Sequence, residues 1–275
     1  MTDEDLRRLR AALAQRPAGL ATDFDGTVSQ IVSPPEAAVP LPGAEDALRR
    51  LVGQLDVVAL VSGRAVADLG ARISVPGAVY VGLHGLEWLQ RDYSDERPRQ
   101  VLAVTPTAEE SRYLAAAGDT LRAAFMDEHG VRIEDKGLGV AVHYRDAADP
   151  LEVRPRILKL CTDLAGAADA EGKLAVREGK LVVELGLGRG TNKGVALRRL
   201  VDERGLRSMA FFGDDVTDMD GFHALGDLRK EGIATICVVV ATPDAPGRLR
   251  EVGDVVLASP REAVDLLAAL AAPLL

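Results

Sequence analysis

The chain has 275 residues, of which 42 are acidic and 33 are basic, and its formal charge at pH 7 is −9. This balance argues against a protein that binds nucleic acid or an anionic membrane, because both partners need a basic surface. With 47% hydrophobic and 27% charged residues, the composition is typical of a soluble globular protein and argues against disorder.

Chain length and apolar content set further expectations. The length lies between one large domain and two modest ones. There is no apolar run of about 18 residues and the first residues are charged, so we expect a cytoplasmic protein without a membrane segment. Cys161 and Cys237 lie far apart without Cys or His at metal-ligand spacing, and we expect buried apolar side chains. We expect a monomer, because the sequence has no long apolar helix that would indicate an interface with a partner.

Short β-branched runs alternate with Ala-, Leu- and Arg-rich segments of helical period on both sides of the chain's middle. This alternation is typical of βαβ units and predicts an α/β, doubly wound, Rossmann-like core around a parallel sheet. The predicted strands are Gly19–Phe24, Val57–Val61, Val79–Gly82, Ser208–Gly213, Thr235–Val240 and Val255–Leu257. The predicted helices are Glu45–Leu55, Ala65–Ile73, Asn192–Arg204, Asp218–Leu225 and Arg261–Leu270.

The middle of the chain breaks this alternation. Two helical segments, Ala108–Glu128 and Asp149–Leu164, are each followed by a pair of strand-like runs with a short turn between them. These runs are Val131–Glu134, Gly139–Tyr144, Leu174–Arg177 and Leu181–Leu185. Such pairs favour antiparallel hairpins. We therefore predict a core formed by residues 1–104 and 187–275, with a smaller α+β module inserted at 105–186.

The strongest motif is Asp23-Phe24-Asp25-Gly26-Thr27-Val28, at the end of the first predicted strand. Ligands bind where the strands of open α/β sheets end, so we expect Asp23 and Asp25 at a binding edge. Two carboxylates this close need a compensating cation or a shared proton. A plain turn is the alternative, since Asp, Gly and Thr favour turns.

A second acidic motif, GDDVTDMD at 213–220, places four carboxylates at the end of the predicted strand Ser208–Gly213. So much negative charge in one loop favours a hard cation such as Mg²⁺. The alternative is a solvated loop in which Asp side chains cap the next helix.

Two further segments could bind an oxyanion. Ser62-Gly63-Arg64 follows a predicted strand and offers a hydroxyl with backbone N–H groups. Thr191-Asn192-Lys193-Gly194 opens a predicted helix, and Lys193 could neutralise a phosphate as a point charge. Either segment alone could instead be a helix cap.

In this order, the motifs DFDGT, SGR, NKG and GDDVTDMD resemble the four motifs of the haloacid dehalogenase-like phosphohydrolases, and the likeness covers essentially the whole chain. Within that superfamily, GLHGLE at 82–87, HYR at 143–145 and the GDDVTD form resemble the trehalose-6-phosphate phosphatases. The resemblance implies a haloacid dehalogenase-like core with an inserted cap, and a Mg²⁺-dependent hydrolase of trehalose 6-phosphate.

The resemblance also implies roles for the core residues. Asp23 would attack phosphorus to form an aspartyl-phosphate, and Asp25 would protonate the leaving sugar oxygen and then deprotonate water. Ser62 and Lys193 would hold the phosphoryl oxygens. The Asp23 carboxylate, the Asp25 carbonyl and Asp214 would hold Mg²⁺. Asp218 would orient the water ligands of the metal, and Asp215 could share that role.

For the inserted module, the resemblance implies a cap that closes over the core and selects the sugar. Polar side chains are needed there because a disaccharide offers many hydroxyls and little apolar surface. Lys136 and Glu184 are the preferred candidates, and each could instead be a solvated hairpin side chain. The other candidates are Arg132, Glu134, His143, Arg145 and Glu178 in the module, with Gly63, Arg64, His84 and Glu87 in the core.

The sequence departs from the family pattern at two places. Many relatives carry an Arg-Pro pair after the residue that is Glu184 here, whereas this chain has Leu-Gly-Leu-Gly at 185–188. They also commonly have Glu after the Thr-Asp of the last motif, where this chain has Met219 and Asp220. Two alternatives follow. One is a phosphatase of another sugar phosphate, such as sucrose phosphate, a glycosylglycerol or glycosylglycerate phosphate or a trehalose-like aminocyclitol phosphate; the other is a non-catalytic sugar-phosphate sensor.

Overall fold

The computed structural model describes residues 2–90, 102–167, 174–242 and 247–272. The chain divides into two compact units, one formed by Met1–Ala103 with Thr191–Leu275 and the other by Val104–Gly190. The predicted insertion, 105–186, lies inside the second unit.

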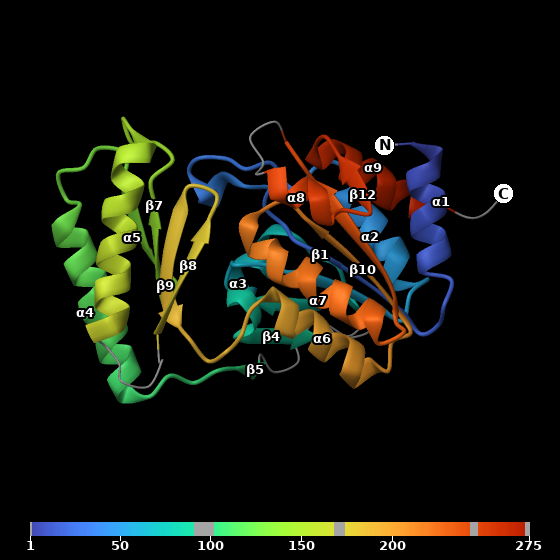
Figure 1. Ribbon diagram of the computed structural model, residues 1–275, viewed down its shortest axis with the longest axis horizontal. Coiled ribbons are helices and arrows are strands. Elements are labelled where there is room, and N and C mark those ends of the chain that lie inside the picture. The colour runs from blue at the N-terminus through green and yellow to red at the C-terminus, as the bar shows by residue number, and fades with distance from the viewer. Residues whose placement is uncertain (1, 91–101, 168–173, 243–246, 273–275) are drawn as a thin grey trace. The chain divides into compact units, whose positions relative to one another are not determined.

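The larger unit is built on one eight-stranded sheet (Figure 1), in the order β12-β11-β10-β1-β2-β3-β4-β5. All pairings from β12 to β3 are parallel, and β4 and β5 extend the sheet antiparallel. The strands are β1 (Ala18–Thr22), β2 (Val57–Val61), β3 (Val79–Gly82), β4 (Glu87–Gln90), β5 (Leu102–Ala103), β10 (Ser208–Gly213), β11 (Ala234–Val240) and β12 (Val255–Leu257). The parallel part confirms the predicted α/β core.

Helices cover both faces of this sheet. Alternate residues of each strand point to opposite faces, so they pack against two different sets of helices. Leu20 and Phe212 belong to the apolar cluster that contains side chains of α1, α2, α3 and α9. Their neighbours Ala21 and Phe211 belong to the cluster that contains side chains of α6, α7 and α8. The helices are α1 (Asp3–Ala12), α2 (Ala44–Val52), α3 (Val66–Arg72), α6 (Lys193–Arg204), α7 (Met219–Lys230), α8 (Gly247–Val252) and α9 (Pro260–Ala271).

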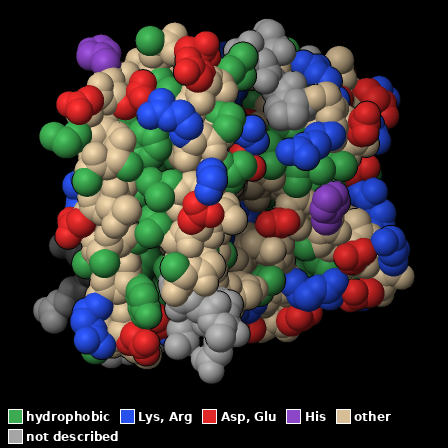
Figure 2. Space-filling view, turned by 60° about the vertical axis from the view of Figure 1, so that its left-hand side comes forward, with side chains coloured by type: hydrophobic (Ala, Val, Ile, Leu, Met, Phe, Trp, Pro, Cys, Tyr) green, Lys and Arg blue, Asp and Glu red, His purple; other side chains and the backbone are tan. Residues whose placement is uncertain are grey.

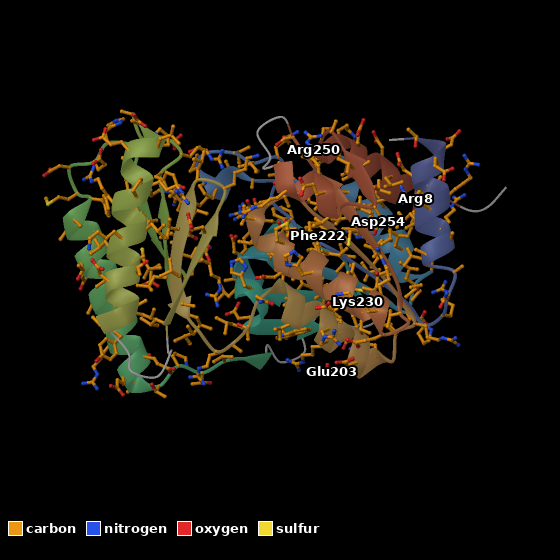
Figure 3. The ribbon with its side chains drawn as sticks, in the orientation of Figure 1. Arg8, Glu203, Phe222, Lys230, Arg250 and Asp254 are labelled. Carbon is orange, nitrogen blue, oxygen red and sulfur yellow. The ribbon has the colours of Figure 1, made fainter. Side chains whose placement is uncertain are left out.

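Helix α1 was not among the predicted elements. It begins with a capping box in which Thr2 accepts the N–H of Asp5 and Asp5 accepts the N–H of Thr2. Arg8 donates to the carbonyl of Asp254, and the Asp254 carboxylate accepts the N–H of Cys237, 2.8 Å away (Figure 3). Since Cys237 belongs to β11, these contacts fasten α1 to the sheet.

The smaller unit packs a four-stranded antiparallel sheet, in the order β6-β7-β9-β8, against two helices (Figure 1). The elements are α4 (Ala108–Ala124), β6 (Arg132–Asp135), β7 (Gly139–His143), α5 (Pro150–Ala167), β8 (Leu174–Gly179) and β9 (Val182–Leu187). The antiparallel pairing of β6 with β7 and of β8 with β9 confirms the predicted hairpins.

Both cysteines are buried thiols, as expected, and burial raises the pKa of Cys161 to about 11. Within the described residues, no helix has the length and apolarity needed to cross a membrane. Acidic and basic side chains are interspersed on the face that Figure 2 shows, and the described side chains there form no broad basic area.

Candidate active site

The first acidic motif forms a tight turn at the end of β1. The strand ends at Thr22, and the N–H of Asp23 still donates to Phe212 on β10, at 2.9 Å. Phe24 then leaves the predicted strand because its carbonyl accepts the N–H groups of Val28 and Ser29. This turn directs the Asp23 side chain to the carboxyl edge of the sheet.

Gly26 makes close approach of the two acidic loops possible. Its φ is +78°, and a Cβ there would lie 2.1 Å from Asp214 Oδ2. The second loop, which follows β10, therefore packs directly against the first. The next residue, Thr27, is buried, and its hydroxyl donates to Asp214 Oδ1 at 3.4 Å.

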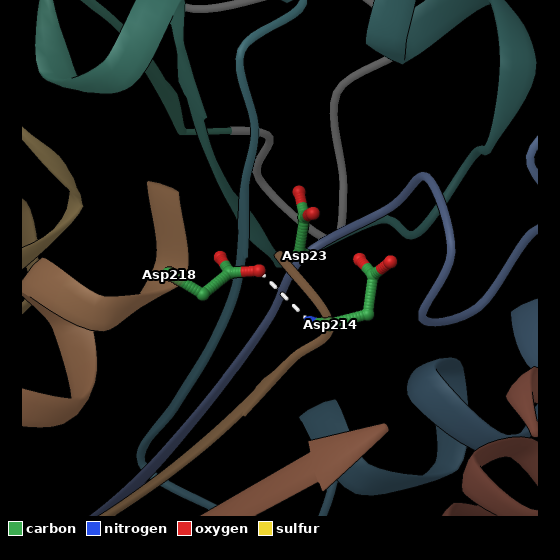
Figure 4. A group of neighbouring side chains, drawn as sticks. All are labelled: Asp23, Asp214 and Asp218. Carbon is green, nitrogen blue, oxygen red and sulfur yellow. Dashed lines mark hydrogen bonds between the residues drawn. The ribbon is translucent and has the colours of Figure 1, made fainter. Parts of the chain in front are cut away.

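Asp23, Asp214 and Asp218 form one buried cluster (Figure 4), in which a carboxylate oxygen from each lies within 4.8 Å of the others. Burial raises the pKa of Asp23 to about 8, and Asp218 and Asp25 add to the rise while Lys193 opposes it. Burial likewise raises the pKa of Asp214 well above its ordinary value, and the neighbouring carboxylates add to this rise. The positive charge available to the cluster therefore does not offset the burial of its carboxylates.

Lys193, the first residue of α6, supplies one buried cation. Its Nζ lies 3.0 Å from Asp23 Oδ1 and 2.7 Å from Asp218 Oδ1, and the side chain is 2% exposed. Burial alone would lower the pKa of Lys193, but the carboxylates of Asp218 and Asp23 outweigh it and raise that pKa. Asn192 starts the helix by accepting the N–H of Val195. The amine is therefore a fixed positive charge beside Asp23.

The cluster fits a hard divalent cation. Asp214 Oδ2 is buried and, among the described residues, has no hydrogen-bond partner, which is costly for a carboxylate. The donors are all oxygen, the type that Mg²⁺ takes. A cation between Asp23 and Asp214 would satisfy that oxygen and relieve the repulsion between carboxylates that adds to the rise of both pKa values.

Asp218 and Asp215 hold the second loop in shape. Asp218 Oδ2 accepts the N–H groups of Asp214 and Asp215, each at 2.9 Å, while its Oδ1 accepts from Lys193. Asp215 Oδ1 accepts the N–H of Val216, where η3 (Val216–Asp218) begins. Asp218 thus orients Asp214 and Lys193. Asp215 caps η3, which agrees with the alternative interpretation of this loop, in which Asp side chains cap the next helix.

The structure places Arg64 on the second carboxylate of the first motif. Arg64 Nε lies 2.6 Å from Asp25 Oδ2, and Nη2 lies 2.8 Å from Asp25 Oδ1. Its Nη1 donates to Asp68 at 2.7 Å, and its Nη2 also donates to the Pro35 carbonyl. These contacts hold Asp25 in one orientation, a role that the sequence did not predict.

Ser62 and Gly63 lie where β2 ends, beside η2 (Leu83–Gly85). Ser62 is buried and its Oγ accepts the N–H of Arg64 at 3.2 Å. A Cβ at Gly63 would lie 2.8 Å from Nε2 of His84, so the glycine admits the buried imidazole ring. Leu83 and His84 both have positive φ, at 47° and 56°. Such conformations are uncommon for these residue types and mark a strained turn.

Glu87 serves a neighbouring helix. Its Oε2 accepts the N–H of Val66, at 2.7 Å, where α3 begins. The structure therefore places Glu87 as a cap of α3.

In the smaller unit, most of the candidate side chains gather on one face of the sheet, called here the polar face. Glu134, Ala141, Glu184 and Arg177 are paired in one row across β6, β7, β9 and β8. Directly paired residues point to the same side of a sheet. The adjoining rows of this face contain Arg132 paired with His143, and Gly139 paired with Gly186. The intervening rows point the other way and are largely apolar: Val140, Val142, Val183 and Leu185 are buried.

One ion pair and one hydrogen bond organise the polar face. Lys136 pairs with Glu184, and both side chains are largely buried. His143 Nε2 lies 2.8 Å from Glu134 Oε2, and this hydrogen bond is the main reason that the pKa of Glu134 is lowered. The sequence candidates Arg132, Glu134, Lys136, His143 and Glu184 are thus brought together.

Glu178 and Arg145 are placed elsewhere. Glu178 is paired with Val183, a residue of the apolar face, and its carboxylate lies 2.5 Å from Arg154 of α5. Arg145 donates to the Lys180 carbonyl at 3.0 Å. Glu178 is therefore separated from the polar face, while its neighbour Arg177, absent from the candidates, belongs to it.

We compared the chain with known protein families and solved structures. The trehalose-phosphatase family model matches residues 21–248. A trehalose-phosphate phosphatase of Mycobacterium ulcerans is 37% identical over 223 residues, covering 77% of this chain and 54% of that protein. The corresponding protein of Mycobacterium leprae is 34% identical and is covered over 51% of its length. The chain thus spans about half the length of the relatives it matches.

Solved structures support the fold. The C-terminal domain of a Candida albicans trehalose-6-phosphate phosphatase matches with a TM-score of 0.78 at 23% identity, over 97% of this chain and 94% of that one. The C-terminal domain of a Candida albicans trehalose synthase regulatory protein matches with a TM-score of 0.70 at 12% identity, over 96% of this chain and 97% of that one. These matches confirm the predicted haloacid dehalogenase-like fold. By the family model and the sequence relatives, the chain belongs to the trehalose-phosphatase family.

Proposed function

We propose that this chain is a Mg²⁺-dependent phosphatase that converts trehalose 6-phosphate and water to trehalose and phosphate, acting in the cytoplasm as a monomer. The observation that carries the proposal is the buried cluster of Asp23, Asp214 and Lys193. In a member of the trehalose-phosphatase family, this cluster offers a nucleophile, a metal ligand and a fixed cation at one strand edge. The names of the relatives support the choice of sugar.

In the first step, Asp23 attacks phosphorus. A bond forms from an Asp23 carboxylate oxygen to phosphorus, and the bond from phosphorus to the sugar oxygen breaks. Lys193 and the Ser62 hydroxyl hold the phosphoryl oxygens, where negative charge must be stabilised. Lys193 also favours the ionised form of Asp23, because its ammonium opposes the burial that raises the pKa of Asp23.

Asp25 moves the proton in both steps. It donates a proton to the leaving sugar oxygen and then takes one from the water that attacks the aspartyl-phosphate. Attack by water breaks the phosphorus bond to Asp23 and releases phosphate. Arg64 donates to both oxygens of Asp25 and so orients this carboxylate, and one of these hydrogen bonds must open for Asp25 to carry the proton that it gives to the sugar.

Asp23, the Asp25 carbonyl and Asp214 would hold Mg²⁺, with Asp218 and Asp215 shaping the loop. When bound, the ion neutralises the repulsion between the Asp23 carboxylate and the phosphate.

The polar face of the smaller unit would select the sugar, so this unit acts as the cap. Lys136 and Glu184 would bind sugar hydroxyls, with Glu134, His143 and Arg132 beside them. Glu178 is left out because it faces α5. Each sugar hydroxyl both donates and accepts hydrogen bonds, and a cationic side chain next to a carboxylate offers the matching donor and acceptor.

Phosphate release tests the proposal. The purified chain is incubated with trehalose 6-phosphate, sucrose 6-phosphate, glucose 6-phosphate and an aryl phosphate, with Mg²⁺ and then with EDTA. We expect Mg²⁺-dependent release that is fastest from trehalose 6-phosphate. Release from the aryl phosphate or another sugar phosphate alone would overturn the choice of sugar and keep the chemistry. No release from any ester would favour a sugar-phosphate sensor.

A further inference from the structure

Arg177 of β8 belongs to the polar face. It is paired directly with Glu184, which is paired with Ala141, which is paired with Glu134. The row therefore contains an acidic group, a methyl group, an acidic group and a guanidinium. Because paired residues share a face, Arg177 points to the same side as both glutamates. The side chain is half-buried.

The guanidinium of Arg177 lies over Gly186. A Cβ added to Gly186 would lie 3.5 Å from Nη1 of Arg177, and Nη2 donates to the carbonyl of Leu187 at 3.1 Å. Gly186 is paired with Gly139, so two adjacent positions of this face carry no side chain. The guanidinium thus has a fixed orientation beside a flat part of the sheet.

Charge on the polar face also favours a role in binding. Glu184 is paired with Lys136, and Glu134 with His143. Three permanently cationic side chains, Arg132, Lys136 and Arg177, share the face with these two carboxylates. Together these side chains place hydrogen-bond donors beside acceptors, and the hydroxyl groups of a sugar need both.

We propose that Arg177 is a specificity-determining residue that donates hydrogen bonds to hydroxyl groups of the sugar in the phosphate ester. The inference rests on the proposed function, since it names a further residue of the same sugar site. A guanidinium is planar and has five donors, so one group can bind two neighbouring hydroxyls. Its bond to Leu187 reduces the entropy lost when the sugar binds.

A purely structural role for Arg177 makes a different prediction. The ladder between β8 and β9 already joins six residue pairs, from Leu174–Leu187 to Gly179–Val182, through the backbone. If Arg177 served only to fasten these strands, its loss would change stability without discriminating between substrates. The two roles are therefore separated by the Michaelis constant for different esters.

The test compares Arg177→Ala and Arg177→Lys with Arg154→Ala, a control that removes an arginine of α5 paired with Glu178. Values of kcat and KM are measured with trehalose 6-phosphate and an aryl phosphate at saturating Mg²⁺, together with Tm. For Arg177→Ala we expect KM for trehalose 6-phosphate to rise about 10-fold or more, with kcat/KM for the aryl phosphate within about twofold of wild type. The KM of Arg177→Lys for trehalose 6-phosphate should lie between the values of wild type and Arg177→Ala. The kcat and KM of Arg154→Ala should match those of wild type with both esters.

Two results would overturn the role of Arg177: an unchanged KM for trehalose 6-phosphate in Arg177→Ala, or an equal loss with both esters. The wild-type panel separates this failure from that of the proposed function. If wild type prefers another sugar phosphate, the proposed sugar is wrong and the same variants are measured with the preferred ester. If wild type hydrolyses no sugar phosphate, the proposed function and the role of Arg177 both fall.

Discussion

The candidate catalytic cluster and the polar face use charge in different ways. Asp23, Asp214 and Lys193 are almost fully buried, and burial raises the pKa of Asp23 to about 8. On the polar face, Glu134 is partly exposed and a hydrogen bond from His143 lowers its pKa. A buried group with a strongly raised pKa is suited to chemistry, whereas paired, partly exposed charges are suited to reversible binding. Changes in the two regions should therefore have different signatures.

Asp23→Asn should have the largest effect. The amide cannot form the aspartyl-phosphate, so we expect turnover of every ester to fall about 10⁴-fold or more. Binding of trehalose 6-phosphate should survive, since the polar face is untouched. Phosphate release and titration calorimetry measure the two quantities. Appreciable turnover in this variant would mean that another group is the nucleophile.

Lys193→Met tests the buried cation of the same cluster. It leaves the carboxylates of Asp23 and Asp218 without their common partner, at a cost of about 3 kcal/mol in the free energy of unfolding without metal. Urea denaturation in EDTA measures this loss. Addition of Mg²⁺ should restore part of it by supplying positive charge. A stability equal to that of wild type in EDTA would contradict the assigned pairing.

Ser62→Ala and Glu134→Gln form a matched pair, one in each region. The first should lower kcat/KM for trehalose 6-phosphate and for an aryl phosphate alike, by about 10-fold or more, because both present a phosphoryl group. The second should lower kcat/KM about 10-fold for trehalose 6-phosphate alone. Steady-state kinetics with both esters measures these ratios. If the loss of kcat/KM for trehalose 6-phosphate relative to the loss for the aryl phosphate were the same in both variants, the two regions would not differ in function.

Asp68→Asn should have a smaller, pH-dependent effect. Burial would raise the pKa of Asp68, but hydrogen bonds from Arg72 and Arg64 outweigh it and lower that pKa below 3.8. A lowered pKa stabilises the fold above the unfolded value, and this contribution is lost as the pH falls through the folded value. The partly exposed pair gives about 1 kcal/mol or less at pH 7. The Tm difference from wild type should shrink as the pH falls below 3.8 toward the lower pKa of the folded state; a constant difference would contradict this origin.

Glu178→Gln should have the smallest effect. The sequence placed Glu178 among the sugar-binding candidates, whereas the structure pairs it with Arg154 on the apolar side. We expect kcat/KM for trehalose 6-phosphate within about twofold of wild type, since an exposed ion pair contributes little. A selective loss with that ester would favour the sequence-based assignment over the structural one.

The contrast between the regions also explains what could be predicted from the sequence. Ser62 and Asp214 each directly follow a predicted parallel strand, and Asp23 lies at the end of another. The parallel topology brings these strand ends together without further information. The partner of Asp25 could not be predicted, because Arg64 reaches it through the tertiary fold. Strands β4 and β5 were missed because they are short and add to the sheet antiparallel.

On the smaller unit, the side to which a residue points depends on the strand register. A shift of one residue moves every side chain to the opposite face, and the hairpin turn alone did not define the pairing of Arg177 with Glu184. The sequence therefore favoured Glu178 and omitted Arg177. The candidate positions could be predicted from polarity, but their common face required the structure.

The double substitution Lys136→Ala with Glu184→Ala tests the division of labour most directly. The double substitution removes the two opposite charges of this ion pair together, so the fold should be retained, as Tm will show. We predict that kcat/KM for trehalose 6-phosphate falls about 100-fold or more while kcat/KM for an aryl phosphate stays within about threefold of wild type. Equal loss with both esters, or no loss with either, would contradict the assignment of chemistry to the core and sugar selection to the polar face.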